Sequence, residues 1–293
     1  MIIGGNKDKV IDNIIKNVED NELNKKVETD DPEYSDEERD KVIKHFFDIR
    51  KNKLKFKVAR MPALKALNDM CKQMDSIIEI DGLENIPDDL TKGIITCNHF
   101  NPMDNIIVRK AINKKYNKDI YIVVQDTNLS LPGELGYFVT HSDVIPLSKS
   151  PSQIINVFTP ELERVLNDNN FVLIYPEEEM WVNYRKPRPC KRGSYQFAHQ
   201  ANVPVISCFT ELIDMDEDDN EQFKQTKYVI HILDIIYPDL EKGLKSDSLE
   251  MAEKDYNLKC EAYEKAYGKK LDYKFDYSDI AGLRVHNGKE VNN

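Results

Sequence analysis

The stretch Gly93-Ile94-Ile95-Thr96-Cys97-Asn98-His99-Phe100-Asn101-Pro102-Met103-Asp104 joins a strand pattern to a helix pattern. Its first five residues are apolar or β-branched, which is typical of a buried strand. Asn101-Pro102 is typical of a helix start, with asparagine as the cap and proline in the first position. The stretch therefore predicts a strand followed at once by a helix. In such folds, ligands bind beyond the carboxyl ends of the strands.

His99 and Asp104 are separated by four residues at the end of that strand. A histidine can act as a general base near neutral pH, and a carboxylate beside it fixes its tautomer and stabilises the imidazolium that forms. No serine or cysteine in an elbow motif accompanies the pair, so the nucleophile that it would activate belongs to a substrate. The alternative is a capping turn that contains a histidine by chance, and this short pattern alone does not separate the two.

The rest of the chain continues the strand and helix pattern. Strands are expected at 76–80, 93–97, 120–125, 143–147, 171–175, 203–209 and 228–235, and helices at 104–116, 152–166 and 193–200. This alternation predicts an α/β fold with a largely parallel mixed sheet flanked by helices. Residues 214–221 are acidic and are expected to form a hairpin or loop, and 247–267 a charged surface helix. The acidic run resembles a calcium loop only superficially, because it lacks the required glycine.

Charge divides the chain ahead of this region. We expect an acidic N-terminal segment at 1–40, a basic amphipathic helical segment at 41–75 and an α/β domain with a helical tail at 76–293. A basic amphipathic helix can lie on an anionic membrane surface, and it can equally pack on the core with its charged face in solvent. The acidic segment is either a mobile tail or a partner for the basic one.

Composition excludes several classes of protein. The net charge of −11 argues against nucleic-acid binding, which needs a basic face. No apolar run is long enough to span a bilayer, and the N-terminus lacks the core of a signal peptide. The five cysteines are scattered and form no C-x-x-C, so neither a disulfide framework nor a zinc site is expected. The sequence predicts a soluble cytoplasmic protein that associates peripherally with a membrane.

Four blocks of sequence, in order, make the chain similar to the glycerolipid acyltransferase family, which includes 1-acylglycerol-3-phosphate acyltransferase. The first is the N-H-x-x-x-x-D block that contains His99 and Asp104. The other blocks are Leu135–Phe138 with Val144–Lys149, Phe171–Glu177 in place of a block that usually continues F-P-E-G-T-R-S, and Asn202–Ile206. Together the blocks cover roughly residues 78–210.

The resemblance implies a reaction and roles for several residues. His99 would deprotonate a substrate hydroxyl and Asp104 would orient His99, so that the hydroxyl oxygen attacks an acyl thioester. No metal and no cofactor is implied, because the thioester of acyl-carrier protein or coenzyme A serves as co-substrate. The residues expected to bind substrate are Asn98, Lys149, Glu177, Arg185, Arg188 and Lys191.

The third block departs from the family pattern. After Pro176-Glu177, the usual glycine, threonine and arginine are replaced by Glu178, Glu179 and Met180. Two acids where a phosphate-binding arginine is expected should repel a phosphate. Either the phosphate contacts have moved to the basic residues downstream, or the acceptor is not a simple glycerol phosphate.

Three functions remain open from the sequence. The resemblance favours an O-acyltransferase that acts on a lysophospholipid or related glycerolipid at a membrane surface. The altered third block leaves a second reading, a non-catalytic lipid-binding or tethering protein on a degenerate acyltransferase fold. A third is a hydrolase in which His99 activates water.

Overall fold

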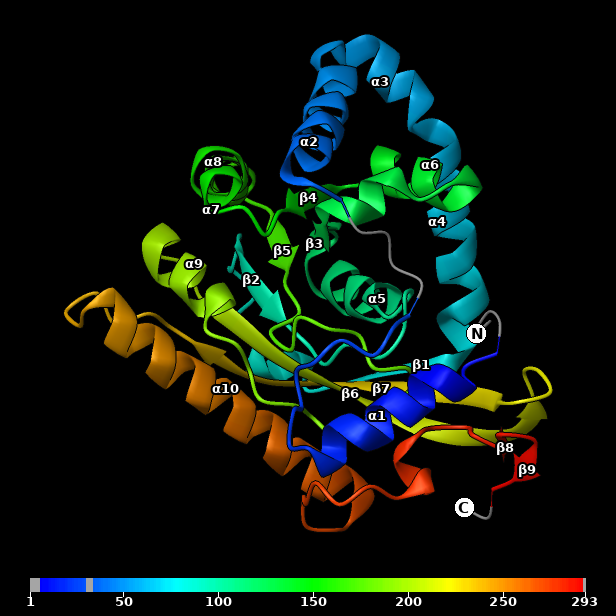
Figure 1. The fold of residues 1–293 in the computed structure, drawn as a ribbon. Coiled ribbons are helices and arrows are strands. Elements are labelled where there is room, and N and C mark those ends of the chain that lie inside the picture. Colours follow the sequence, from blue (N-terminus) through cyan, green and yellow to red (C-terminus); the bar gives the residue numbers. More distant parts are fainter. Residues whose placement is uncertain (1–5, 30–33, 292–293) are drawn as a thin grey trace.

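The computed structural model describes residues 6–29 and 34–291. Within them, seven strands form one sheet in the order β1-β7-β6-β2-β5-β3-β4 (Figure 1). Neighbouring strands run parallel except β6 and β7, which form a long antiparallel hairpin. The strands are β1 (Ile78–Asp81), β2 (Gly93–Thr96), β3 (Ile120–Gln125), β4 (Val144–Leu147), β5 (Phe171–Leu173), β6 (Val205–Asp218) and β7 (Lys224–Ile236). The predicted α/β fold and all seven predicted strands are confirmed.

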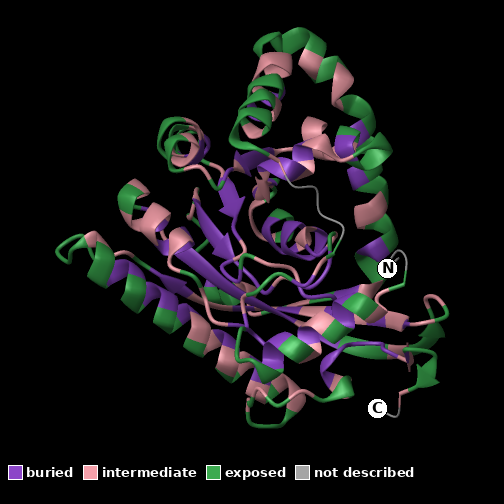
Figure 2. Ribbon diagram, in the orientation of Figure 1, coloured by how far each residue is buried: buried purple, intermediate pink, exposed green. Residues whose placement is uncertain are grey.

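Helices cover both faces of this sheet (Figure 1). Successive strand residues point to opposite faces, so Ile95 belongs to the apolar cluster that contains α5, and Ile94 belongs to the cluster that contains α8, α9 and α10. The central strands β2 and β5 are buried along their whole length (Figure 2). The helices that follow β2 in the chain are α5 (Asn105–Tyr116), α6 (Gly133–His141), α7 (Pro151–Gln153), α8 (Thr159–Asn167), α9 (Gly193–Ala201) and α10 (Leu244–Tyr267).

The basic segment forms helices, as predicted, but in three pieces. They are α2 (Asp36–Lys51), α3 (Lys53–Ala59) and α4 (Met61–Met74). The first break has a local cause, because the Asn52 side chain accepts a hydrogen bond from the Lys55 N–H and so caps a new helix. Pro62 then stands in the first turn of α4, where its missing N–H costs nothing. The three helices project from the sheet as an arch with α3 at its apex (Figure 1).

The acidic segment is anchored to the rest of the fold. Its helix α1 (Asp8–Glu19) buries an apolar face against the loop after β5 and the C-terminal region. The members of this cluster include Val10, Ile11, Ile14, Val18, Leu23, Val27, Trp181, Tyr184, Phe223 and Leu283. Over its described residues 6–29, the segment is therefore not the mobile tail that the sequence allowed. The C-terminal region ends in the small hairpin of β8 (Val285–His286) and β9 (Lys289–Glu290).

The expected charged helix at 247–267 is present, with an exposed outer face, but its inner face is buried more deeply than a surface helix implies. This is helix α10, whose inner face is buried against β6, β7 and α9. Asp255 and Lys259 lie on that face and are fully buried, as one ion pair. Charged residues on a helix face are exposed by default, and only a partner in the core reverses that. Among the described residues, no helix is both long and apolar enough to cross a bilayer.

Candidate active site

The loop after β2 is anchored by Asn98. Its side-chain amide donates to the Thr210 carbonyl at 3.0 Å, and its amide oxygen accepts from the Thr210 N–H at 2.7 Å. Both polar groups of Asn98 thus bind strand β6, and the residue is buried. In this position it holds the loop to the sheet and does not face an open site. The neighbouring Cys97 is no nucleophile, because burial raises the pKa of its thiol to about 12.

His99 and Asp104 are brought together as predicted. His99 Nδ1 lies 2.8 Å from Asp104 Oδ2. The same carboxylate oxygen accepts from the N–H groups of Phe100 and Asn101, at 3.0 and 3.2 Å. Asp104 is buried, whereas the His99 side chain is 20% exposed. A buried carboxylate that accepts from Nδ1 leaves the other ring nitrogen, Nε2, as the one able to take a proton.

The geometry of this loop corrects the predicted helix start. Helix α5 begins at Asn105 and not at Pro102, and residues 101–104 form a turn. The N–H groups of Phe100 and Asn101 both donate to the Asp104 carboxylate, so the backbone curls around this side chain before the helix begins. Asn101 caps this turn, with its side-chain oxygen accepting from the Met103 N–H at 3.0 Å.

Tyr175, which was not among the predicted site residues, contacts both His99 and Asp104. The Tyr175 ring is stacked on the His99 ring, with centroids 3.9 Å apart and planes 13° from parallel. The Tyr175 hydroxyl donates to Asp104 Oδ1. Burial, and then the Asp104 carboxylate, raise the pKa of this hydroxyl well above its usual value, so it remains a donor. Its place directly before Pro176-Glu177 in the third block was the available signal.

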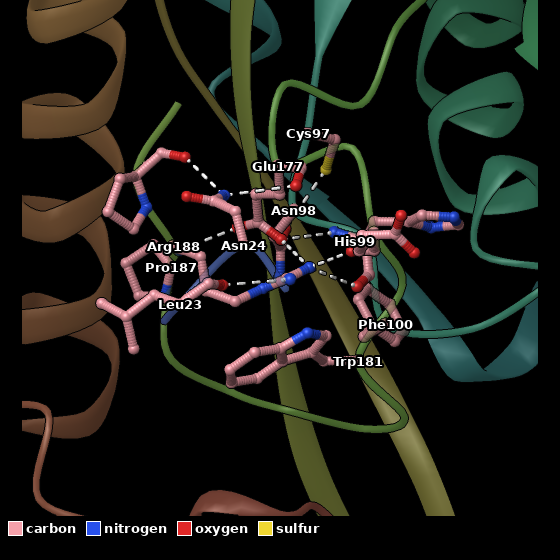
Figure 3. Close-up of polar contacts among 12 residues, drawn as sticks. Leu23, Asn24, Cys97, Asn98, His99, Phe100, Glu177, Trp181, Pro187 and Arg188 are labelled. Atoms are coloured by element: carbon pink, nitrogen blue, oxygen red, sulfur yellow. Dashed lines mark hydrogen bonds and ion pairs between the residues drawn. The ribbon is translucent and has the colours of Figure 1, made fainter. Parts of the chain in front are cut away.

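Glu177 holds the backbone of the loop after β2 (Figure 3). Its carboxylate accepts from the His99 N–H at 3.2 Å, from the Arg188 N–H at 2.9 Å and from the Arg188 guanidinium at 2.7 Å. Both side chains are almost fully buried. The guanidinium also donates to the His99 carbonyl and stacks on Trp181, 4.6 Å from the ring centroid. In this arrangement Glu177 and Arg188 fix the position of His99.

The N-terminal segment forms hydrogen bonds with the loop that follows β5 (Figure 3). The Asn24 amide donates to the carbonyls of Glu177 and Pro189, at 3.2 and 2.9 Å. The indole N–H of Trp181 donates to the Lys25 carbonyl at 2.9 Å. Residues 23–25 thus contact the altered third block along its length. Sequence gave no sign of this, because the two segments lie more than 150 positions apart.

The four basic residues of the predicted substrate-binding set, Lys149, Arg185, Arg188 and Lys191, differ in their surroundings. The Arg188 guanidinium forms a buried ion pair with Glu177, and Arg185 donates to the Leu212 carbonyl and pairs with Asp214. Lys149 and Lys191 are exposed, the first just after β4 and the second ahead of α9. The two arginines therefore serve the fold in this conformation, and the two lysines extend into solvent.

Glu178, at the position where the family usually has glycine, adopts a left-handed backbone conformation. Its φ is +65°, in the left-handed region that glycine adopts without strain. For a residue with a Cβ atom this conformation costs about 1–2 kcal/mol.

Glu178→Gly is accordingly expected to raise the free energy of unfolding by about 0.5–1 kcal/mol, after allowance for the greater freedom of glycine in the unfolded chain. Glu179→Gly is the matched control, since Glu179 lies outside the left-handed region and glycine there should only destabilise. Urea denaturation of both variants measures the difference. Equal destabilisation by both would contradict the assigned strain.

Comparison with known proteins bears on the whole arrangement. Residues 77–211 match the family model described as Acyltransferase, and they contain His99, Asp104, Tyr175 and Glu177. Residues 77–211 are therefore identified as an acyltransferase-family domain. The resemblance seen in the four blocks is thereby confirmed, and no curated protein matches the chain.

A solved structure adds evidence on the fold. The chain is similar to the crystal structure of the 1-acyl-sn-glycerophosphate acyltransferase PlsC from Thermotoga maritima, with 17% identity and a TM-score of 0.51. The match covers 79% of this chain and 89% of that one. At this identity the likeness concerns the fold, which extends beyond the acyltransferase domain to much of the rest of the chain.

Proposed function

We propose that the protein transfers a fatty acyl group from a thioester to a hydroxyl of a lysophospholipid or a related glycerolipid. The observation that carries the proposal is the 2.8 Å contact between His99 Nδ1 and the buried Asp104 carboxylate, inside a domain of the acyltransferase family. A degenerate, purely lipid-binding fold would have no use for a paired and oriented histidine. The intact pair therefore favours catalysis over the binding alternative.

The proposed chemistry follows from the free ring nitrogen. His99 Nε2 takes the proton from the acceptor hydroxyl, and the oxygen attacks the thioester carbonyl carbon. The new C–O bond forms as the C–S bond breaks, and the leaving thiolate recovers the proton from the imidazolium. Asp104 stabilises the imidazolium between these two steps. The scheme calls on no metal or cofactor besides the acyl thioester, on either acyl-carrier protein or coenzyme A.

The acceptor site is proposed on the exposed side of the pair. Lys149 and Lys191 are the basic residues of the predicted set that we assign to a phosphate on the acceptor, because both are exposed and the arginines are engaged elsewhere. Lysine binds phosphate as a point charge and needs no fixed fork geometry. An acceptor without a phosphate would leave these two lysines unused.

Thiol release tests the proposal directly. Purified protein is incubated with an acyl thioester and a panel of lysolipids, and free thiol is measured with and without each acceptor. Release that requires an acceptor supports acyl transfer and identifies the acceptor class. Release of thiol and fatty acid without any acceptor points to a hydrolase, and lipid binding without release points to the non-catalytic alternative.

Attachment to a membrane surface is proposed through the apex of the helical arch. Leu54 and Val58, which lie four positions apart on α3, are 75% and 61% exposed there, and Met61 at the start of α4 is 63% exposed. Lysines 53, 55 and 57 flank them and supply positive charge toward anionic lipid. Figure 2 shows this apex as largely exposed. Apolar side chains between lysines are typical of an interfacial helix.

Replacing Leu54, Val58 and Met61 together by glutamine is expected to lower partitioning into anionic vesicles by roughly tenfold or more, since burying one such side chain stabilises by about 1.5 kcal/mol or more. Vesicle sedimentation measures the partitioning. Ile155→Gln is the matched control, because Ile155 is 68% exposed but lies outside the arch, between α7 and α8. Unchanged sedimentation of the triple variant would exclude the apex as the attachment site.

A further inference from the structure

Tyr175 contacts both members of the His99–Asp104 pair. Its ring covers the His99 imidazole, and its hydroxyl donates to the Asp104 carboxylate. It reaches them from the loop after β5, whereas the pair belongs to the loop after β2. One side chain from a second strand end therefore restrains the plane of the imidazole and the plane of the carboxylate at once.

The two oxygens of the Asp104 carboxylate have different partners. Oδ2 accepts from His99 Nδ1 and from two backbone N–H groups of its own loop. Oδ1 accepts from the Tyr175 hydroxyl. A carboxylate held through one oxygen alone can still rotate about its Cβ–Cγ bond. The tyrosine hydroxyl blocks that rotation and keeps Oδ2 directed at the imidazole.

The residue type is also informative. The third block of the family usually has phenylalanine immediately before Pro-Glu, and this chain has tyrosine there. A phenylalanine would stack on His99 equally well but has no hydrogen to donate. We propose that Tyr175 is a positioning residue for acyl transfer, which holds the Asp104 carboxylate in the orientation that directs His99 Nε2 at the acceptor. This inference rests on the proposed function.

Tyr175→Phe is expected to lower kcat of acyl transfer by roughly tenfold, the low end of the effect of removing a hydrogen-bond partner that orients the residues of a site, while KM for the acceptor stays unchanged. The ring, its stacking and its packing are kept, so the variant should melt at a temperature close to that of the wild type. Tyr116→Phe is the matched control. Tyr116 stacks on Phe171 at 4.9 Å and donates its hydroxyl to the Pro87 carbonyl at 2.7 Å, away from the pair.

A second readout does not depend on turnover. The His99 Nδ1 proton, shared with Asp104, is followed by proton NMR and assigned by its loss in Asp104→Ala. In Tyr175→Phe this resonance should move downfield, because a carboxylate with one donor fewer accepts more strongly. In Tyr116→Phe it should stay in place.

The two readouts separate the possible failures. An unmoved resonance in Tyr175→Phe, or a kcat equal to that of the wild type, overturns the positioning role. If the wild type transfers no acyl group to any acceptor, the proposed function fails, and the resonance alone still decides whether Tyr175 controls the pair. A fall in kcat accompanied by a moved resonance supports the inference.

Discussion

Replacing His99 by alanine is expected to lower kcat of acyl transfer by roughly 10²–10⁴-fold, the range that general-base catalysis supplies. The methyl group of alanine cannot take a proton from the acceptor hydroxyl, and no other histidine contacts Asp104 among the described residues. Steady-state thiol release, at saturating acyl thioester and acceptor, measures the change. Turnover retained within a factor of a few would eliminate His99 as the base.

The His99→Ala variant should remain folded, which makes the result interpretable. The contacts of His99 with Glu177, Trp181 and Arg188 use its backbone N–H and carbonyl, and alanine preserves them. His199→Ala is the matched control, because His199 Nδ1 also pairs with a carboxylate, that of Asp247, at 2.7 Å between α9 and α10. That variant should lose some stability and keep its kcat, whereas His99→Ala should show the reverse.

Local patterns were sufficient to predict the sheet. Each strand carries its own run of apolar or β-branched residues, and burial on both faces, as in β2 and β5, makes such runs continuous and easy to recognise. The His99–Asp104 contact was also predictable, since five positions of chain can close only a small loop. The helix expected at 104–116 begins at Asn105, as predicted to within one residue, whereas the expected start at Asn101-Pro102 was wrong because Asn101 caps a turn that precedes the helix.

Contacts across long stretches of sequence were not predictable in the same way. Asn24 and Glu177, or Tyr175 and Asp104, have no periodicity or spacing that relates them. Arg188 illustrates this limit. Its type and position in the sequence suggested a phosphate contact, but its side chain is buried in an ion pair with Glu177 and stabilises the fold. A basic residue in a sequence reveals its charge but not the partner that neutralises it.

Helix α10 gives the strongest example and the largest expected effect on stability. Asp255 and Lys259 are fully buried, and the carboxylate also accepts from the hydroxyls of Thr96, Tyr195 and Ser207. Thr96 ends strand β2, three positions before His99, and it also accepts from the Lys259 ammonium at 3.1 Å. The cluster therefore joins α9, α10, β2 and β6 close in sequence to the His99–Asp104 pair.

Lys259→Met is expected to lower the free energy of unfolding by about 3–5 kcal/mol, because it leaves the Asp255 charge buried without a cation. Urea denaturation measures the loss. Lys242→Met is the control: Lys242 pairs with Glu250, also a residue of α10, but both side chains are about half exposed. A surface pair of this kind contributes about 0–1 kcal/mol, so the control should differ little from the wild type.

The double variant Asp255→Asn with Lys259→Met decides whether charge is the cause. It removes both charges and keeps a side chain that can still accept from Thr96, Tyr195 or Ser207. If the unpaired carboxylate is responsible for the loss, the double variant must be more stable than Lys259→Met alone, although it carries one substitution more. If the loss reflects only the missing lysine packing, adding Asp255→Asn can only destabilise further. The sign of the second step thus separates electrostatics from packing without any assumption about its size.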